Sequence, residues 1–169
     1  MPTQIRPAVA TDLPRMMGMN HSVTSDYVWQ LDLRRETGQV SATLREVRLP
    51  RPVPVAYPRN PFALADEWQY KDVVLVAAAG ASVIGYVCIV EQSAATVAWV
   101  TDLVVVPDQR RHGIGSLLLK SAQDWALERG SHMLIFETQA KNQPAIRMAQ
   151  KAGLEFCGYN DHYYANQDV

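Results

Sequence analysis

The sequence has almost no net charge, no long hydrophobic run and no recognisable signal sequence. Its 169 residues hold 16 Lys and Arg against 17 Asp and Glu, a net charge of -1. That balance argues against nucleic acid or an acidic membrane as a partner, because both bind basic surfaces. No apolar stretch approaches the roughly 20 residues that cross a bilayer, and no signal sequence opens the chain. We therefore expect a cytoplasmic protein.

The chain also has only two cysteines, Cys88 and Cys157. They have neither a metal-ligand spacing nor the number that a disulfide framework needs. Each lies in an apolar stretch, so we expect a buried thiol at both positions. His21, His132 and His162 show no ligand spacing either, and no metal site is expected. The apolar share of 48% and the charged share of 20% are those of an ordinary globular domain with a real core.

One stretch, from a strand through a turn into a helix, organises the chain. The β-branched apolar run Val97–Val106 predicts a buried strand, which Pro107 ends because it has no N–H for a ladder. A helix follows, with apolar residues at helical spacing: Ile114, Leu117, Leu118, Ala122 and Trp125. The turn of residues 110–115 thus lies at a helix N-terminus, where free N–H groups and the helix dipole attract an anion.

The residues of this turn suit a phosphate. Gly113 and Gly115 lack the Cβ atoms that would keep a phosphate away, and Arg110 and Arg111 can add charge-assisted donors. A P-loop is excluded because no Gly-Lys-Ser/Thr follows, and Leu118 stands where a dinucleotide fingerprint needs a third glycine. The alternative is a plain strand-to-helix turn with solvated arginines.

The order of residues from Leu103 to Leu118 resembles the signature of the GNAT superfamily of N-acetyltransferases. In that family an Arg/Gln-x-x-Gly-x-Gly loop binds the pyrophosphate of coenzyme A. The resemblance implies an α/β fold (an α+β mixed sheet, the acyl-CoA N-acyltransferase fold) and acetyl transfer from acetyl-CoA to an amine. It implies coenzyme contacts by Val104, Val105, Val106, Arg110, Arg111, His112, Gly113, Ile114, Gly115, Ser116 and Asn142. Residues 137–145 are more narrowly similar to streptothricin acetyltransferases.

The other elements are expected around this stretch. An edge strand at residues 5–8 precedes a helix that Thr11 caps and that runs to about Asn20. Strands at residues 73–79, 83–91 and 96–106 form an antiparallel meander, in which Gly85 marks a bulge or a close backbone approach. The helix at residues 114–129 then leads to a parallel strand at residues 132–137. Asn142 caps a last helix, and a further strand is expected from Gly153.

Residues 27–49 alternate between apolar and polar side chains, which predicts a hairpin with one apolar face. A turn at Thr37 and Gly38 joins its strands. The expected cross-strand pairs are Leu33 with Ala42, Leu31 with Leu44 and, after a β-bulge near Arg45 and Glu46, Trp29 with Val47. The common GNAT plan has helical structure here. Residues 27–50 are therefore expected to be a hairpin insertion within a single domain of residues 1–169.

Two features bear on partners. Residues 34–59 hold six arginines against Glu36 and Glu46, which predicts a solvated face, a dimer contact, or a lip that attracts an acidic acceptor or the phosphates of the coenzyme. The chain also stops where the last GNAT strand would start. We expect that this strand is cut short or supplied by a partner, so a homodimer stays open.

Acetyl transfer needs a base, and three carboxylates are candidates. Asp102 is the one charged residue in the run of residues 97–106, and a buried carboxylate needs a reason; it belongs to the active site or points outward. Glu91 and Glu137, at the ends of the neighbouring strands, are its rivals. The usual general acid of the family is missing, because Ala149 occupies the position at which many family members have tyrosine. Tyr159, or else Tyr163 or Tyr164, can replace it, although a thiolate leaves tolerably without an acid.

The sequence thus predicts an N-acetyltransferase that moves an acetyl group from acetyl-CoA to a primary amine of a small molecule, such as an antibiotic, by direct attack. One alternative is a protein acetyltransferase that acts on an N-terminus or a lysine. A second alternative, motivated by Ala149, is a sensor domain that binds acetyl-CoA without turnover.

Overall fold

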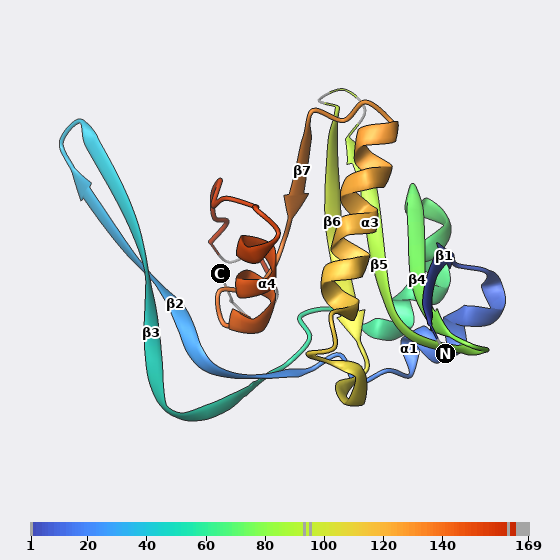
Figure 1. Ribbon diagram of the computed structural model, residues 1–169. Coiled ribbons are helices and arrows are strands. Elements are labelled where there is room, and N and C mark those ends of the chain that lie inside the picture. The colour runs from blue at the N-terminus through green and yellow to red at the C-terminus, as the bar shows by residue number, and fades with distance from the viewer. Residues whose placement is uncertain (1, 93, 95, 162, 165–169) are drawn as a thin grey trace. The chain divides into compact units, whose positions relative to one another are not determined.

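The computed structural model describes residues 2–92, 94, 96–161, 163 and 164 (Figure 1). His162 therefore lies outside the described residues. The chain divides into two compact units, each described by itself. The first unit holds residues 1–21, 59–137 and 148–155, and the second holds residues 22–58, 138–147 and 156–169. The expectation of a single domain stays a prediction.

The first unit is built on a five-stranded mixed sheet with the order β1-β4-β5-β6-β7. Its strands are β1 (Thr3–Pro7), β4 (Val73–Ala79), β5 (Ser82–Gln92), β6 (Val97–Val105) and β7 (Met133–Phe136). All neighbours are antiparallel except β6 and β7, which are parallel. The edge strand, the meander and the crossover that the sequence predicts are confirmed, with bounds within two residues for the meander.

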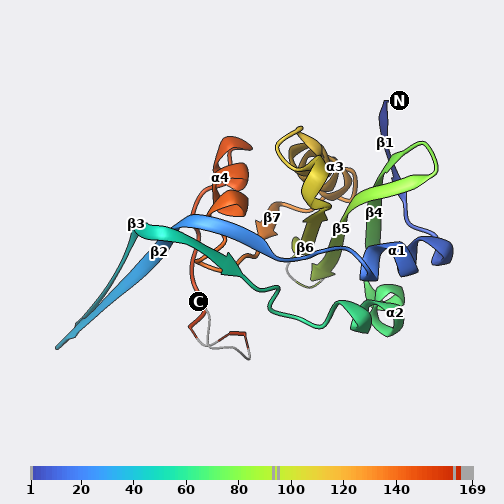
Figure 2. The same ribbon diagram turned by 90° about the horizontal axis from the view of Figure 1, so that it is seen from below.

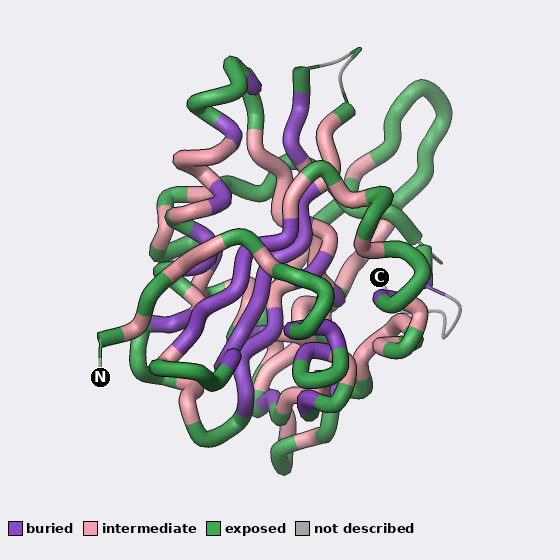
Figure 3. The backbone as a smooth tube through the Cα atoms, turned by 90° about the vertical axis from the view of Figure 1, so that its right-hand side faces the viewer, coloured by how far each residue is buried: buried purple, intermediate pink, exposed green. Residues whose placement is uncertain are grey.

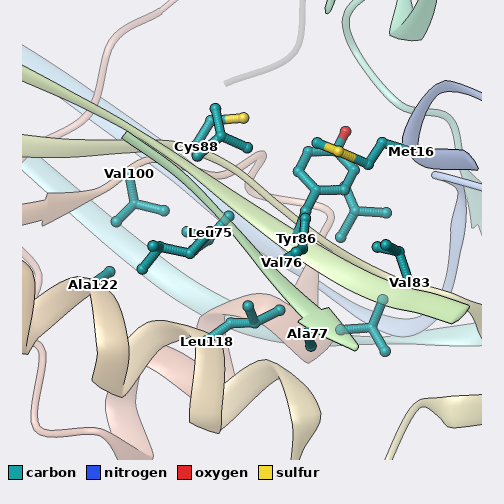
Figure 4. Close-up of a cluster of buried hydrophobic side chains, with 14 of the residues drawn as sticks. Met16, Leu75, Val76, Ala77, Val83, Tyr86, Cys88, Val100, Leu118 and Ala122 are labelled. Carbon is teal, nitrogen blue, oxygen red and sulfur yellow. The ribbon is translucent and has the colours of Figure 1, made fainter. Parts of the chain in front are cut away.

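Helices cover both faces of this sheet. The helices of the chain are α1 (Leu13–Met17), α2 (Leu64–Glu67), α3 (Ile114–Glu128) and α4 (Gln143–Lys151), with short 3₁₀ helices η1 (Ala10–Asp12), η2 (Pro61–Ala63), η3 (Trp68–Tyr70) and η4 (Pro107–Gln109). Figure 2 shows α3 on one face, and α1 and α2 on the other. Side chains of these helices pack onto the sheet (Figure 4). Leu118 and Ala122 of α3 contact one face, while Met16 of α1 lies by Tyr86 on the other.

The core of the unit lies in β4, β5 and β6. Their burial patterns are almost continuous, and Figure 3 shows the buried stretches gathered in these strands. Because both faces of the sheet are covered, apolar residues fill the inner strands without alternation, which is why the sequence shows apolar runs here. Cys88 is fully buried within this core, as expected.

The first helix is shorter than the sequence predicts. Thr11 lies inside η1 and caps nothing, and α1 ends before Gly18. The carboxylate of Asp12 takes the capping role instead, because it accepts a hydrogen bond of 2.9 Å from the Val9 N–H. It also accepts two hydrogen bonds, of 2.7 and 2.9 Å, from the Arg6 guanidinium. These bonds lower the pKa of Asp12 and join β1 to the start of α1.

The sheet is irregular at two places that concern the site. Gly85 lies beside β6 so closely that a Cβ atom would stand 2.8 Å from the Val104 carbonyl oxygen, and the register with β4 shifts next to it. The predicted close approach and bulge are therefore both confirmed. In β6, Val100 pairs with Ile89 and Asp102 with Cys88. Thr101 between them is thus an extra, bulged residue.

The second unit contains the hairpin of β2 (Val23–Glu36) and β3 (Gln39–Val55). The turn at Thr37 and Gly38 and the predicted pairs of Leu33 with Ala42 and of Leu31 with Leu44 are confirmed. The predicted bulge at Arg45 and Glu46 is wrong, because Trp29 faces Glu46 in regular register.

The irregularity of the hairpin lies further along, where Tyr27 pairs with Arg48 but Ser25 pairs with Val53. Pro50 and Pro52 lie in the part of β3 that the pairing skips. Proline has no N–H to donate, so the ladder breaks at these prolines rather than at the change of apolar phase.

The strand expected from Gly153 is not found in the described residues. Residues 155–161 are all exposed, so no buried face favours a strand there. Cys157 lies in this exposed segment, and the prediction of a buried thiol at this position is wrong. None of the helices in the described part of the chain has the length and apolar character that crossing a membrane requires.

Candidate active site

Strands β6 and β7 pair over four residues and then part (Figure 1). The pairing runs from Val97 opposite Met133 to Val100 opposite Phe136. One further bond of 3.2 Å, from the Glu137 N–H to the Val100 carbonyl, follows it. Since β6 continues to residue 105, its last residues lie beyond the pairing with β7. We call this place the β6–β7 parting.

The pairing with β5 fixes the direction of each N–H along β6. The Val106 N–H donates to the Ile84 carbonyl at 3.0 Å. Because successive N–H groups of a strand point to opposite sides, the N–H of Val104 also faces β5, and those of Leu103 and Val105 face the parting. Of the three valines that the resemblance implies, only Val105 directs its N–H there.

The turn before α3 has the backbone that an anion site needs. Arg111 has a φ of 68° and Gly113 a φ of 84°. Two left-handed residues in one turn make a concave row of N–H groups, and Arg111 adopts this conformation at a cost of about 1 kcal/mol. A Cβ atom on Gly113 would meet nothing within 4 Å. Open space therefore lies over the N-terminus of a 15-residue helix, which fits a diphosphate.

Arg110 and Gly115 serve the architecture of the turn. The Arg110 guanidinium donates to the Val105 carbonyl at 2.8 Å and to the Asn20 carbonyl at 2.7 Å, and its partial burial lowers its pKa. A Cβ atom on Gly115 would stand 2.7 Å from the Met148 sulfur, so glycine lets the Met148 side chain pack against the start of α3. Other members of the predicted set, Arg111, His112 and Ser116, are exposed, and Ile114 is buried.

A compact charged cluster lies at the β6–β7 parting. Arg59 donates to Asp102 Oδ1 at 3.2 Å and to Glu137 Oε1 at 2.5 Å. The same guanidinium donates to the Thr101 carbonyl at 2.8 Å, and the Thr101 hydroxyl donates to Asp102 Oδ2 at 2.9 Å. The side chains of Asp102 and Glu137 are only 6% and 13% exposed. The ion pair with Arg59 explains how the carboxylate of Asp102 can be buried, for which the sequence alone indicates no partner.

The structure places Glu91, the remaining candidate base, outside this cluster. Glu91 pairs with Ala98, four residues before Asp102 on β6, or about 13 Å along the strand. There its carboxylate accepts a 2.9 Å hydrogen bond from Arg129. Tyr159 and Asn142 belong to the second unit. Tyr159 is exposed, and the Asn142 side chain accepts a 3.3 Å bond from the Ala145 N–H, the predicted cap of α4.

Two functional features are absent from the sequence predictions. Arg59 is one of several arginines near the prolines, and no spacing distinguishes it. The pair of the half-buried His21 and the buried Tyr86 is the other. His21 Nδ1 lies 2.7 Å from the Met19 carbonyl and Nε2 lies 2.9 Å from the Tyr86 hydroxyl. Because a carbonyl only accepts, Nδ1 carries the proton and the phenol donates to Nε2.

Comparison with known proteins identifies the class. The model of the Acetyltransferase (GNAT) family matches residues 42–154, and the chain belongs to this family. The chain is 29% identical, over 167 residues, to streptothricin acetyltransferase of Streptomyces lavendulae, a match that covers 95% of this chain and 86% of the relative.

Solved structures agree with this assignment. The crystal structure of nourseothricin acetyltransferase has a TM-score of 0.80 at 27% identity, with 97% of this chain and 89% of that chain covered. A Bacillus anthracis str. Ames protein assigned as a streptothricin acetyltransferase, solved in complex with acetyl coenzyme A, has a TM-score of 0.73 at 20% identity, with 98% and 91% covered. This second likeness concerns the fold alone.

The protein is therefore an acetyl-CoA-dependent acetyltransferase of the GNAT family, related to streptothricin acetyltransferases. The mixed sheet and its crossover are the predicted fold. The hypothesis of a sensor domain without turnover is not retained.

The pair of His21 and Tyr86 predicts how stability depends on pH. Burial lowers the pKa of His21 in the folded state, so the unfolded chain takes up this proton first as the pH falls below about 6.5. The unfolded state then binds more protons, and the free energy of unfolding falls. Between pH 7 and pH 5.5 the urea midpoint of the wild type should fall more steeply than that of His21→Gln. Equal slopes would contradict a neutral, half-buried imidazole at His21.

Proposed function

We propose that the acceptor is a primary amine on a small cationic molecule of the streptothricin kind. The observation that carries this proposal is the cluster at the β6–β7 parting. Two carboxylates and one guanidinium leave it with a net charge of -1, which attracts an ammonium group. The relative from Streptomyces lavendulae, named for streptothricin, supports the same class.

Each part of the first unit has a role in this proposal. The N-terminal turn of α3, with Gly113 and Ser116, binds the pyrophosphate through backbone N–H groups. The N–H of Val105 donates to the thioester oxygen, where negative charge develops. When bound, acetyl-CoA supplies the acetyl group that moves to the amine nitrogen with loss of the thiol. The pair of Asp102 and Glu137 takes the proton that the ammonium group must lose.

The position of the base follows from exposure and hydrogen bonding. Both oxygens of Asp102 accept bonds, one from Arg59 and one from Thr101. Glu137 stands at the end of β7 and its side chain is more exposed than that of Asp102. We therefore assign the proton transfer to Glu137 and a supporting charge to Asp102. No described tyrosine is assigned as the acid, since the thiolate is a tolerable leaving group.

A panel of acceptors tests the substrate class. Purified protein is mixed with acetyl-CoA and either streptothricin, a peptide with a free N-terminus, or a peptide with a lysine. Thiol release and the mass of the product are measured, and the N-acetylated compound serves as the negative control. We expect kcat/KM for streptothricin to exceed that for either peptide at least about tenfold, a difference of about 1.4 kcal/mol. A peptide that is the better acceptor would overturn the proposal in favour of a protein acetyltransferase.

A matched pair of glycine variants tests the coenzyme turn. Gly113 and Gly130 lie at the two ends of α3, both with positive φ and with nothing within 4 Å of a Cβ atom. Gly113→Asp puts a negative charge where the pyrophosphate binds, whereas Gly130→Asp has the same backbone strain away from it. Calorimetric titration with acetyl-CoA should show a loss of affinity of about tenfold to a hundredfold for Gly113→Asp only. Equal affinities, with both folds intact by circular dichroism, would exclude this turn as the site.

A further inference from the structure

Arg59 joins three elements at the β6–β7 parting. Asp102 lies on β6, Glu137 directly follows β7, and Arg59 comes from the segment before η2. We propose that Arg59 is the positioning residue of the transfer site, which holds the two carboxylates and the bulged backbone of β6 in the arrangement that acetyl transfer needs. This inference rests on the proposed function, because it assigns a role relative to the proposed base.

The first step of the argument concerns the two carboxylates. Asp102 and Glu137 follow the paired residues Val100 and Phe136 on adjacent strands, so the topology brings two negative charges together in a largely buried place. Different nitrogens of one guanidinium contact them, Nη1 at 3.2 Å and Nη2 at 2.5 Å. The rigid fork of the guanidinium therefore sets the distance between the carboxylates, which the flexible ammonium of lysine cannot do.

The second step concerns the bulge. Thr101 is the extra residue of β6, and its carbonyl accepts a 2.8 Å bond from Arg59. The bulge decides which N–H groups of the following residues face β5 and which face the parting. Arg59 thus stabilises the backbone conformation that directs the N–H of Val105 toward the proposed acetyl position.

The third step concerns charge. His21 of the N-terminal segment and Cys88 of β5 interact electrostatically with Asp102. Lys71 and Glu67 interact in the same way with Cys88, and Arg110 with His21. Arg59 is the cation in direct contact with both carboxylates. Without it, the repulsion between the two carboxylates is no longer offset by this guanidinium, and the separation that its fork sets is lost.

The test compares Arg59→Gln and Arg59→Lys with Arg51→Gln, a change at an exposed arginine of β3, eight residues earlier in the chain. The kcat with streptothricin and the KM for acetyl-CoA are measured for each. For Arg59→Gln we expect kcat to fall about tenfold or more, with KM for acetyl-CoA within about threefold of the wild type. Arg59→Lys should also lose kcat, because it restores the positive charge but not the rigid fork of the guanidinium. Values of kcat for both variants that match that of Arg51→Gln would overturn the inference.

A second measurement keeps the inference separate from the proposed acceptor. Carbon-13 NMR at one pH compares the carboxyl resonances of Asp102 and Glu137 in the absence of any amine, with assignments from Asp102→Asn and Glu137→Gln. Resonances that are displaced in Arg59→Gln but not in Arg51→Gln support the positioning role even if streptothricin is not acetylated, in which case only the proposed acceptor fails. Resonances that match those of the wild type overturn it whatever the activity. If Arg59→Gln does not fold, Arg59→Lys decides by its kcat: an unchanged value overturns the inference.

Discussion

The parting of β6 from β7 after Val100 is the constraint on which the rest of the first unit depends. Two parallel strands that separate leave a backbone edge without ladder partners, and such an edge has to be compensated by charge, by packing or by a ligand. Here the Arg59 cluster stands at the start of the parting, and the turn before α3 lies where β6 ends. Both ends of the unpaired edge are thereby fixed by side chains with defined partners.

The turn before α3 shows how one set of residues serves both architecture and binding. Gly115 packs closely against the sulfur of Met148, and Arg110 donates hydrogen bonds to the carbonyls of Val105 and Asn20. These contacts hold the turn, so that the N–H groups near Gly113 are preorganised for an anion. Arg110 and Gly115, which are readily recognised in the motif, thus hold the turn in place. The backbone between them is the proposed binding group.

Much of the first unit was predictable from the sequence because its signals are local. Apolar runs predicted β4 to β6, and the helical spacing of apolar residues predicted α3. The hairpin register near its tip followed from alternation and from Gly38, which has a φ of 77°. By contrast, the bulge of the hairpin lies where Pro50 and Pro52 interrupt the ladder, and the segment after Gly153 has the composition of a strand without a face to bury.

The candidate site was predictable only in part, for a physical reason. The anion turn is contiguous in sequence, so its glycines and arginines can be recognised. Arg59 reaches Asp102 across 43 residues and Glu137 across 78, and an ion pair of such separation leaves no local pattern. The unusual carboxylate at Asp102 did indicate that a partner was needed, but burial alone does not say which of the chain's arginines is that partner.

The most direct test of this account measures the backbone N–H groups of the parting. In the nitrogen-15 NMR spectrum, a non-hydrolysable acetyl-CoA analogue should shift the amide signals of Leu103 and Val105, whose N–H groups face the parting. The signals of Val104 and Val106, whose N–H groups face β5, should move much less. This alternation would place the acetyl group at the β6–β7 parting. Equal shifts at all four residues, or none despite saturation with the analogue, would contradict the account.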